Sequence, residues 1–267
     1  MIPEPAPTVR ELLAFYLEAG VDCALAEEPV DRLAELDAPP PAPRAAPVET
    51  PRPVAAPAVM RGEAAPAPDV AIASAREAAR TAPTLEALRE LMQNFEGCAL
   101  KHTATRLVFA DGNPQARIMF VGEAPGRDED IEGLPFVGRS GKLLDLMIGA
   151  IGLNRTTAYI TNVIPWRPPG NRTPTPQETQ ICLPFIQRHI ELVNPDLLVT
   201  LGNPSTQTLL STREGIMRTR GRWFDYDTGQ RTIRALPTFH PAYLLRSPSY
   251  KRLAWQDLRA IAKVLAG

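Results

Sequence analysis

Short apolar runs alternate with amphipathic stretches along the chain from residue 70 onward. Four of these runs have the mostly apolar character of strands buried on both faces: 118–121, 158–163, 196–201 and 233–238. Apolar residues at helical spacing predict helices at 70–82, 85–95, 138–151, 176–193, from 205 onward and at 249–265. Strands that alternate with helices in this way predict an α/β fold, in which helices cover both faces of a parallel sheet.

The N-terminal region has a different composition. Apolar spacing predicts short amphipathic helices at residues 8–19 and 29–36, whereas residues 38–68 contain ten prolines. A run so rich in Pro and Ala buries too little apolar surface to fold, so we expect a flexible linker. The predicted organisation therefore has three parts: a helical segment (1–37), a linker (38–69) and one folded domain (70–267).

The net charge of −1 conceals an uneven distribution. Residues 1–70 contain five Lys/Arg against twelve Asp/Glu, a net charge of −7, whereas residues 205–267 contain eleven against four, a net charge of +7. A basic C-terminal third that also carries aromatic residues favours an anionic partner, and nucleic acid is the usual one. A solvated surface with an arginine bias would have the same composition.

The cysteines and the hydropathy indicate the compartment. Three cysteines, Cys23, Cys98 and Cys182, are too few and too scattered for a disulfide framework, which favours a reducing cytosol. The chain shows neither a signal-peptide pattern nor an apolar run of 18 residues. We therefore expect a cytoplasmic protein without a membrane partner. We also expect a monomer, and a DNA partner would add association with the nucleoid.

The loops after the four predicted strands contain the candidate site residues. The first loop, 122–126 (GEAPG), is a tight turn in which the backbone can approach a ligand closely. Because parallel strands end at one edge of a sheet, we expect all four loops to build one site there. The side chains that would meet at this edge are Glu123, Glu129, Phe136, Asn162 and His240.

These residue types together suit the recognition and release of a uracil base. An Asn amide presents a donor beside an acceptor, which matches the N3–H and O4 edge of uracil, and a Phe ring can stack on the base. A His can stabilise the leaving base as an anion, and a carboxylate can hold a water molecule. Taken singly, Phe136 is more often a core residue, Asn162 a turn residue and His240 a loop hydrogen-bonder, so the hypothesis depends on their convergence.

Four motifs follow one another in order: GEAPGRDED (122–130), GLPFVG (133–138), TNVIPWRPPGNRTPTP (161–176) and HPAYLLR (240–246). With this order and spacing, the chain resembles the uracil-DNA glycosylase superfamily over residues 95–265, most closely its family 4 enzymes. The resemblance implies a three-layer α/β/α fold with a central four-stranded parallel sheet. It also implies a monofunctional enzyme that flips deoxyuridine out of single- or double-stranded DNA and hydrolyses the N-glycosidic bond, leaving an abasic site.

The resemblance also implies roles for individual residues. Contacts to uracil fall on Gly122, Ala124, Phe136, Asn162 and His240. Contacts to DNA fall on Arg167, Asn171, Arg172, Tyr243, Leu244, Leu245 and Arg246, and one of Tyr243, Leu244 and Leu245 would enter the base stack as a wedge.

Catalysis is implied for Glu123, Glu129 and His240. In family 1 enzymes an Asp that activates water stands at the position of Ala124, so the water-holding carboxylate here is either Glu123 or Glu129. The remaining acidic side chains of the loop, Asp128, Asp130 and Glu132, are interpreted as solvated charge. We see no Lys in position to form a Schiff base, so lyase activity is not expected.

One family feature is incomplete. Family 4 enzymes hold a 4Fe-4S cluster with four cysteines; Cys98 and Cys182 match two of these, but Phe95 and Trp166 stand in place of the others. Because two thiolates cannot hold such a cluster, we expect no cofactor and no metal, with Phe95 and Trp166 filling the space by apolar packing.

Two alternatives to a glycosylase stay open. A sensor that binds uracil or abasic DNA with little or no turnover would retain the abasic product tightly. A generic nucleotide-binding α/β protein would show no affinity for DNA and no salt-dependent binding, which the basic C-terminal third argues against.

Overall fold

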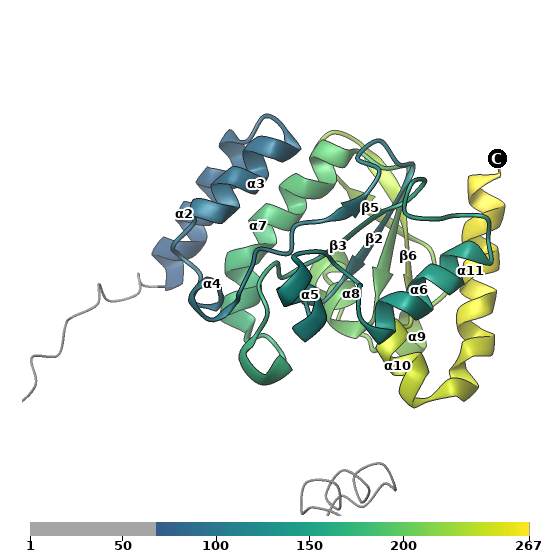
Figure 1. Ribbon diagram of the computed structural model, residues 1–267. Helices are drawn as coiled ribbons and strands as arrows, with labels where there is room; N and C mark the ends of the chain where they lie inside the picture. Colours follow the sequence, from purple (N-terminus) through teal and green to yellow (C-terminus); the bar gives the residue numbers. More distant parts are fainter. Residues whose placement is uncertain (1–67, 267) are drawn as a thin grey trace, which may run out of the picture. The chain divides into compact units, whose positions relative to one another are not determined.

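The computed structural model describes residues 68–266, so the predicted N-terminal helices, most of the linker and Cys23 lie outside the described residues (Figure 1). The helices are α2 (Pro68–Thr81), α3 (Leu85–Asn94), α4 (Leu100–Thr103), α5 (Arg127–Glu132), α6 (Arg139–Gly149), α7 (Pro176–Val193), α8 (Asn203–Leu210), α9 (Ile216–Thr219), α10 (Pro241–Arg246) and α11 (Lys251–Leu265). The strands are β1 (Asp111–Gly112), β2 (Ile118–Gly122), β3 (Tyr159–Asn162), β4 (Leu197–Leu201), β5 (Phe224–Asp227) and β6 (Thr232–Thr238). Short 3-10 turns occur at η2 (Pro169–Asn171) and η3 (Pro248–Tyr250).

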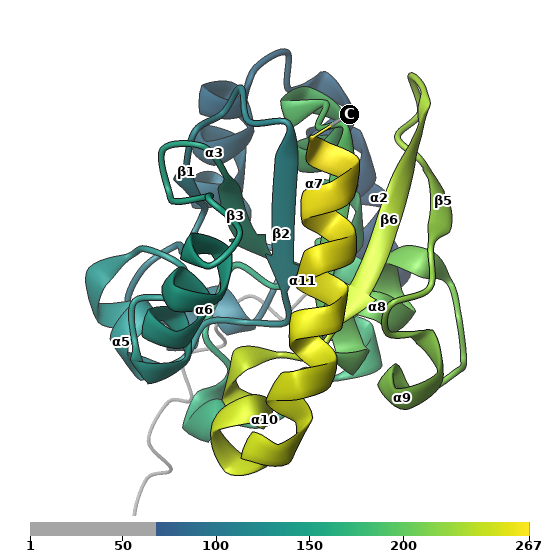
Figure 2. The ribbon, with the colours of Figure 1, turned by 90° about the vertical axis from the view of Figure 1, so that its right-hand side faces the viewer.

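One mixed sheet forms the middle layer, with the strand order β1-β3-β2-β4-β6-β5. The four inner strands are parallel, as the sequence predicted, and short antiparallel strands flank them on both edges. The prediction of four strands was therefore incomplete. It missed β1, which has only two residues, and β5, which lies in the polar, aromatic-bearing segment between α8 and β6 (Figure 2).

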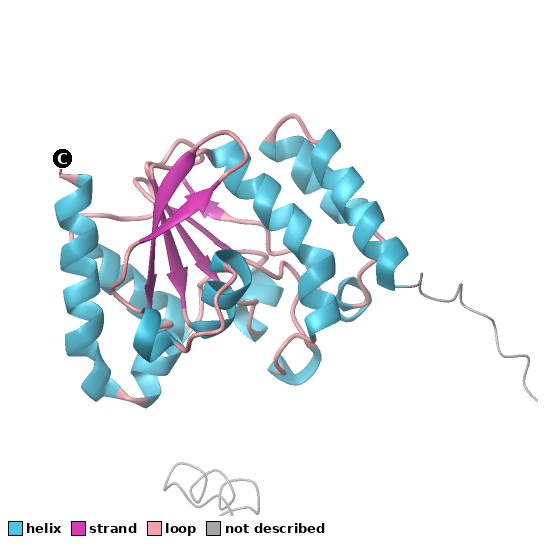
Figure 3. Ribbon diagram, turned by 180° about the vertical axis from the view of Figure 1, so that it is seen from behind, coloured by secondary structure: helices cyan, strands magenta, loops and turns pink. Residues whose placement is uncertain are grey.

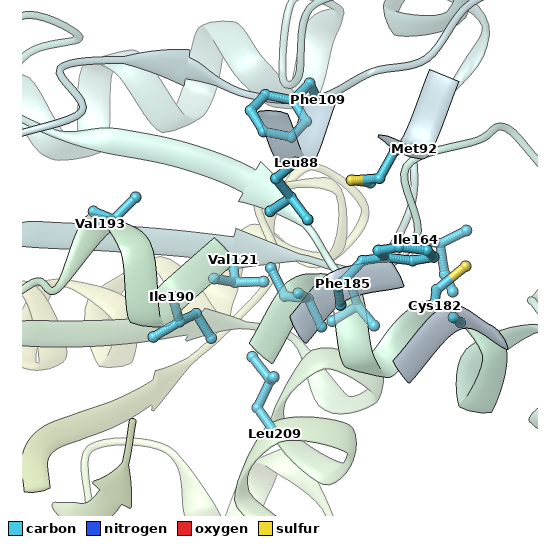
Figure 4. Packing of buried hydrophobic residues seen from close by; sticks show 14 of the residues in the cluster. Leu88, Met92, Phe109, Val121, Ile164, Cys182, Phe185, Ile190, Val193 and Leu209 are labelled. Atoms are coloured by element: carbon cyan, nitrogen blue, oxygen red, sulfur yellow. The ribbon is translucent and has the colours of Figure 1, made fainter. Parts of the chain in front are cut away.

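Helices cover both faces of this sheet and complete three layers. All residues of β2 and β4 are buried, since each strand packs on both faces. On one side α2, α3 and α7 enclose a large apolar cluster, part of which is shown in Figure 4, and on the other side α6, α10 and α11 enclose a second cluster. No helix in the described residues is long and apolar enough to cross a membrane.

The long helix α7 is fixed at its N-terminus by a capping box. The Thr175 hydroxyl accepts a hydrogen bond from the Glu178 N–H at 3.2 Å, and the Glu178 carboxylate accepts one from the Thr175 N–H at 2.7 Å. Pro176 at the first helical position needs no N–H partner. These contacts determine where the long loop after β3 turns into α7, and that loop forms one wall of the site described below.

Strand register places the strand ends level with one another. Gly122 at the end of β2 pairs with Asn162 at the end of β3, and Leu201 of β4 pairs with Thr238 of β6. The inner strands point toward the edge where α5, α8 and α10 lie (Figures 1 and 3). The loops that carry the predicted site residues therefore meet at this edge.

Candidate active site

A cavity of about 360 Å³ lies at the carboxyl edge of the sheet. Its walls come from the loops after β2, β3 and β6, and they include all five side chains that the sequence predicted to meet: Glu123, Glu129, Phe136, Asn162 and His240. The loop after β4 does not line this cavity, which corrects the prediction that all four loops would. It supports the site from behind, because Gly202 (φ 91°) lies so close to His240 that a Cβ there would be 2.9 Å from the His240 Cβ.

Asn162 is buried at the end of β3, and its Oδ1 atom has no hydrogen-bond partner among residues 68–266. Leaving a buried acceptor unpaired costs about 1–3 kcal/mol, so such an atom is typical of a site that a ligand completes. Gly122 provides the space beside it. A Cβ on Gly122 would lie 2.6 Å from the Phe136 ring and closer still to the Asn162 amide.

Phe136 is buried and has a positive φ of 55°, which is rare for a bulky residue. Its ring lies 5.5 Å from that of His240, at an interplanar angle of 32°. Arg155 stabilises this backbone by donating to the carbonyl groups of Phe136 and Pro135. Gly141 allows the Phe136 carbonyl to approach α6, because a Cβ there would collide with it.

Arg155 and Gly141 were not predicted. Arg155 also forms ion pairs with Asp111 of β1 at 2.6 Å and with Asp145 of α6 at 2.9 Å, and thus joins three segments distant in sequence. Nothing local to Arg155 signals this role, since its neighbours form an ordinary polar turn. Both residues support the geometry of Phe136 from outside the cavity.

His240 caps α10, and its Nδ1 atom accepts a hydrogen bond from the Ala242 N–H at 3.1 Å. Burial, with a smaller contribution from Arg246, lowers the pKa of His240 to about 4. The ring is therefore neutral near pH 7. With Nδ1 acting as an acceptor, the ring proton resides on Nε2, which makes Nε2 a hydrogen-bond donor.

The two candidate water-holding carboxylates have different surroundings. Glu129 accepts hydrogen bonds from the N–H groups of Gly126, Val137 and Gly138 at 3.0–3.1 Å, which occupies both of its oxygens. The Glu123 carboxylate accepts no hydrogen bond from residues 68–266, and burial raises the pKa of Glu123. Glu129 thus connects the loop after β2 to the start of α6, whereas the Glu123 carboxylate is not held in this way.

The other acidic residues of this region do not all behave as predicted. Asp128 and Glu132 are exposed, as expected, but Asp130 is only 3% exposed. The segment forms the short helix α5, which turns Asp130 inward, where it accepts hydrogen bonds from the Thr105 N–H at 2.7 Å and the Thr105 hydroxyl at 2.9 Å. The interpretation of Asp130 as solvated charge was wrong.

The predicted wedge residues of α10 also differ from one another. Leu244 is 1% exposed and belongs to the apolar cluster beneath α6 and α11, so it cannot enter a base stack. Tyr243 is partly buried, and its ring lies 5.5 Å from that of Phe239 in a stacked arrangement. Leu245 is 37% exposed. Of these three predicted wedge residues, only Leu245 has an exposed side chain.

The predicted DNA-contacting residues of the loop after β3 lie at the rim of the cavity. Asn171 and Arg172 line it, as does Arg246 from α10. Arg167 donates to the Asn171 amide oxygen at 2.7 Å, and Arg172 forms an ion pair with Glu178 at 2.6 Å. The structure therefore gathers three arginines near one opening of the cavity.

The four positions that correspond to iron-sulfur ligands lie in the apolar core. Cys98 and Cys182 are fully buried free thiols, and a hydrogen bond between them lowers the pKa of Cys98 and raises that of Cys182. Phe95 contacts Phe185 edge-on at 5.0 Å, and Trp166 is 2% exposed. Within residues 68–266, no three His, Cys, Asp or Glu side chains are grouped so that they could hold a metal ion. Two thiols beside two large aromatic rings do not fit a 4Fe-4S cluster.

Comparison with known proteins shows the family that this chain resembles in sequence. Residues 109–259, which include β2 to β6 and the cavity, match the family model of the uracil DNA glycosylase superfamily. A type-4 uracil-DNA glycosylase of Sulfurisphaera tokodaii is 39% identical over 186 residues, which cover 68% of this chain and 84% of the relative. The type-4 enzyme of Thermotoga maritima is 40% identical over 177 residues, covering 65% and 91% respectively. That of Archaeoglobus fulgidus is 38% identical over 181 residues, covering 66% and 90%.

Proposed function

Because the chain belongs to the uracil DNA glycosylase superfamily, we propose that it hydrolyses the N-glycosidic bond of flipped deoxyuridine in DNA and leaves an abasic site. The resemblance to this superfamily and to its type-4 members, stated from the motifs, is confirmed. One observation carries the choice of uracil as the base: buried Asn162, whose Oδ1 atom has no hydrogen-bond partner among the described residues, lines the cavity together with Phe136 and His240.

Recognition of the base follows from the groups around this atom. Asn162 Oδ1 is an acceptor suited to the N3–H of uracil, and the adjacent Nδ2 is a donor suited to O4. Phe136 provides an apolar face for the ring of the base. The positive φ of Phe136 and the close approach of Gly122 place these groups before the base arrives, which lowers the entropy cost of binding.

Bond cleavage requires stabilisation of the departing uracil. As the N1–C1′ bond breaks, its electron pair moves to the base, which leaves as an anion with charge on O2. The neutral His240 ring can donate from Nε2 to this oxygen, an interaction that strengthens as the charge develops. The sugar becomes an oxocarbenium ion, which water attacks at C1′.

We infer that Glu123 receives the proton of this water. Its carboxylate is not occupied by other groups of the described chain, and its raised pKa makes it a better base than an ordinary carboxylate. Glu129 is less suited, because three backbone N–H groups hold both of its oxygens. We assign Glu129 the role of a positioning residue.

We further propose that the protein functions without an iron-sulfur cluster. The support is the number of thiols: the chain has three cysteines, and Cys98 and Cys182 are buried beside Phe95 and Trp166. None of the steps above uses a metal. We also propose that the protein acts on uracil in single strands and in U:G pairs, because flipping the nucleotide costs least there. We propose in addition that it acts as a monomer.

The decisive experiment measures uracil release from labelled oligonucleotides that contain uracil in single strands, U:G pairs and U:A pairs. We expect release by the wild type and a loss of at least 100-fold in Asn162→Ala and in His240→Ala. Asn203→Ala is the matched control, because Asn203 also has an unpartnered buried oxygen but does not line the cavity. If uracil is released from none of the three kinds of DNA, the proposed enzymatic activity is refuted. If, in addition, the protein binds abasic DNA tightly, it is a sensor.

A further inference from the structure

A second cavity, of about 550 Å³, lies on the other side of α5 from the first. Its walls come from α3, α4, residues 104–107, the segment from the C-terminal end of α5 to Leu134, and Trp166 of the loop after β3. Three basic side chains line it, Arg89, Lys101 and Arg106, against one acidic side chain, Glu132. The uracil-recognition chemistry described above makes no use of this cavity.

Two of these positive charges are not neutralised. Arg89 and Arg106 form no ion pair with any residue in the described part of the chain, and both are exposed, whereas Lys101 pairs with Glu96. The Arg89 guanidinium lies over the Phe109 ring, 5.9 Å from its centre, a contact with the ring face that uses none of the hydrogen-bond acceptors of the described residues. The cavity therefore presents two guanidinium groups that can bind an anion, and the guanidinium fork matches the geometry of phosphate as well as that of carboxylate.

The fold determines where Arg106 lies. Buried Asp130 accepts hydrogen bonds from the Arg106 N–H at 3.3 Å and from both donors of Thr105. The Arg106 stem packs against Gly133, where a Cβ would be 3.3 Å from Arg106 Cδ, so that the glycine (φ 77°) admits the arginine to the end of α5. A side chain placed in this way loses less entropy on binding than a free surface arginine.

The helix α5 connects the two cavities. Glu129 accepts a hydrogen bond from the Gly126 N–H in the wall of the first cavity, and the next residue, Asp130, accepts one from the Thr105 N–H in the wall of the second. Arg167, whose guanidinium lies 3.9 Å from Asp130, is hydrogen-bonded to Asn171 at the rim of the first cavity. Basic and polar groups thus continue from one cavity toward the other.

From this arrangement we propose that the second cavity binds a backbone phosphate of the DNA strand that carries the flipped nucleotide. The proposal rests on the proposed function for the identity of the strand. The six residues of α5 span about 9 Å at 1.5 Å per residue, and phosphates along one strand are about 3.4 Å apart along the axis. The bound phosphate is therefore about three or more nucleotides from the flipped base.

The test measures how the contribution of Arg89 and Arg106 to DNA affinity depends on the length of the DNA. Fluorescence anisotropy would measure the affinity of the full-length protein for oligonucleotides with a tetrahydrofuran abasic analogue, flanked by two to ten nucleotides on either side. We expect the double variant R89Q/R106Q to bind long oligonucleotides about tenfold more weakly than the wild type at moderate salt. With two flanking nucleotides on each side, the affinities of the two proteins should be equal.

Salt dependence supplies a second readout. Loss of one phosphate contact lowers the slope of log affinity against log salt by about 0.7 for a single strand, so the double variant, which loses the one proposed contact, should have a slope smaller by about 0.7 on long DNA. When the two flanks are extended one at a time, only one of them should restore the difference in affinity between the wild type and R89Q/R106Q. That flank shows whether the phosphate lies on the 5′ or the 3′ side of the flipped nucleotide. The control is R76Q/R259Q, which removes two exposed arginines of α2 and α11 that do not line either cavity.

Three results would overturn the proposal. R89Q/R106Q could lose the same affinity at every DNA length, R76Q/R259Q could lose as much affinity as R89Q/R106Q, or R89Q/R106Q could lose no affinity at any length. Thermal unfolding of each variant shows whether it is folded. If the wild type releases no uracil but the length-dependent difference persists, the proposed function fails and the phosphate site stands. If uracil is released and the difference is absent, the phosphate site alone fails.

Discussion

Replacing Glu129 with Gln tests whether this residue supports the loops or activates water. Its carboxylate accepts three backbone N–H groups at 3.0–3.1 Å. The Gln side chain keeps one acceptor oxygen, for Val137 and Gly138, and turns an NH2 group toward the N–H of Gly126. Loss of this charge-assisted hydrogen bond, with one buried donor left unpaired, costs about 1–3 kcal/mol. We therefore expect the free energy of unfolding of Glu129→Gln to fall by about this amount.

Glu123→Gln is the matched variant. The Glu123 carboxylate accepts no hydrogen bond from the described residues, so its replacement should change the free energy of unfolding by less than about 0.5 kcal/mol. Removal of a general base lowers the rate of the chemical step by about 100-fold or more. Glu123→Gln should therefore lower the rate of uracil release, because it removes the general base. Glu129→Gln should lower the free energy of unfolding, because it weakens the hydrogen bonds that hold the loops.

The pH dependence separates the two roles further. Burial raises the pKa of Glu123, and only the ionised carboxylate can take a proton from water. The wild-type rate should fall as the pH drops through this raised pKa, because the carboxylate becomes protonated. This fall in rate at acidic pH, the acidic limb of the pH–rate profile, should be absent in Glu123→Gln and present in Glu129→Gln.

The assays are urea unfolding and single-turnover uracil release, measured from mildly acidic to neutral pH. The reasoning is refuted if Glu129→Gln retains wild-type stability and lacks the acidic limb, while Glu123→Gln retains the limb. In that case the hydrogen bonds to Glu129 would orient a catalytic base.

Three further outcomes are expected. Gly122→Ala should lose at least 100-fold in single-turnover rate, since its Cβ would displace the neighbouring ring and amide, whereas Gly149→Ala, with open space around it, should be active and slightly more stable. Leu245→Ala should slow uracil release from duplex DNA more than from single strands, because a wedge matters only where bases are stacked, while Leu244→Ala should instead lower the free energy of unfolding by about 2–5 kcal/mol. Iron analysis of anaerobically purified protein should find no stoichiometric iron and no visible absorbance from a cluster; stoichiometric iron would overturn the cofactor proposal.

The regular elements of this fold were predictable because their signals are local. The strands β2 and β4 are buried runs of five residues that are almost entirely apolar, and α6, α7 and α11 repeat apolar residues at helical spacing. The strand β5 (FDYD) buries only one residue, and α5 (RDEDIE) has one apolar residue among six. Neither segment carries the periodic signal that a sequence pattern needs.

The side chains of the site were partly predictable for a similar reason. Asn162, Phe136 and His240 belong to motifs whose spacing indicated the cavity that they line. The functions of Glu129 and Asp130 depend on the direction in which α5 turns each of them, and this direction is set by contacts with residues up to 25 positions away. Leu244 and Leu245 are adjacent in sequence, yet α10 buries one and exposes the other.

The aromatic packing around Cys98 and Cys182 has an evolutionary consequence. A four-cysteine site would require both Phe95 and Trp166 to be replaced, and either change alone leaves three thiols, too few for the four ligands of a cubane cluster. Each single replacement also opens a void in a close-packed core, at a cost of about 3 kcal/mol. Each intermediate between this packing and a four-cysteine site would therefore be less stable and would still lack a complete ligand set, so natural selection would oppose the first step.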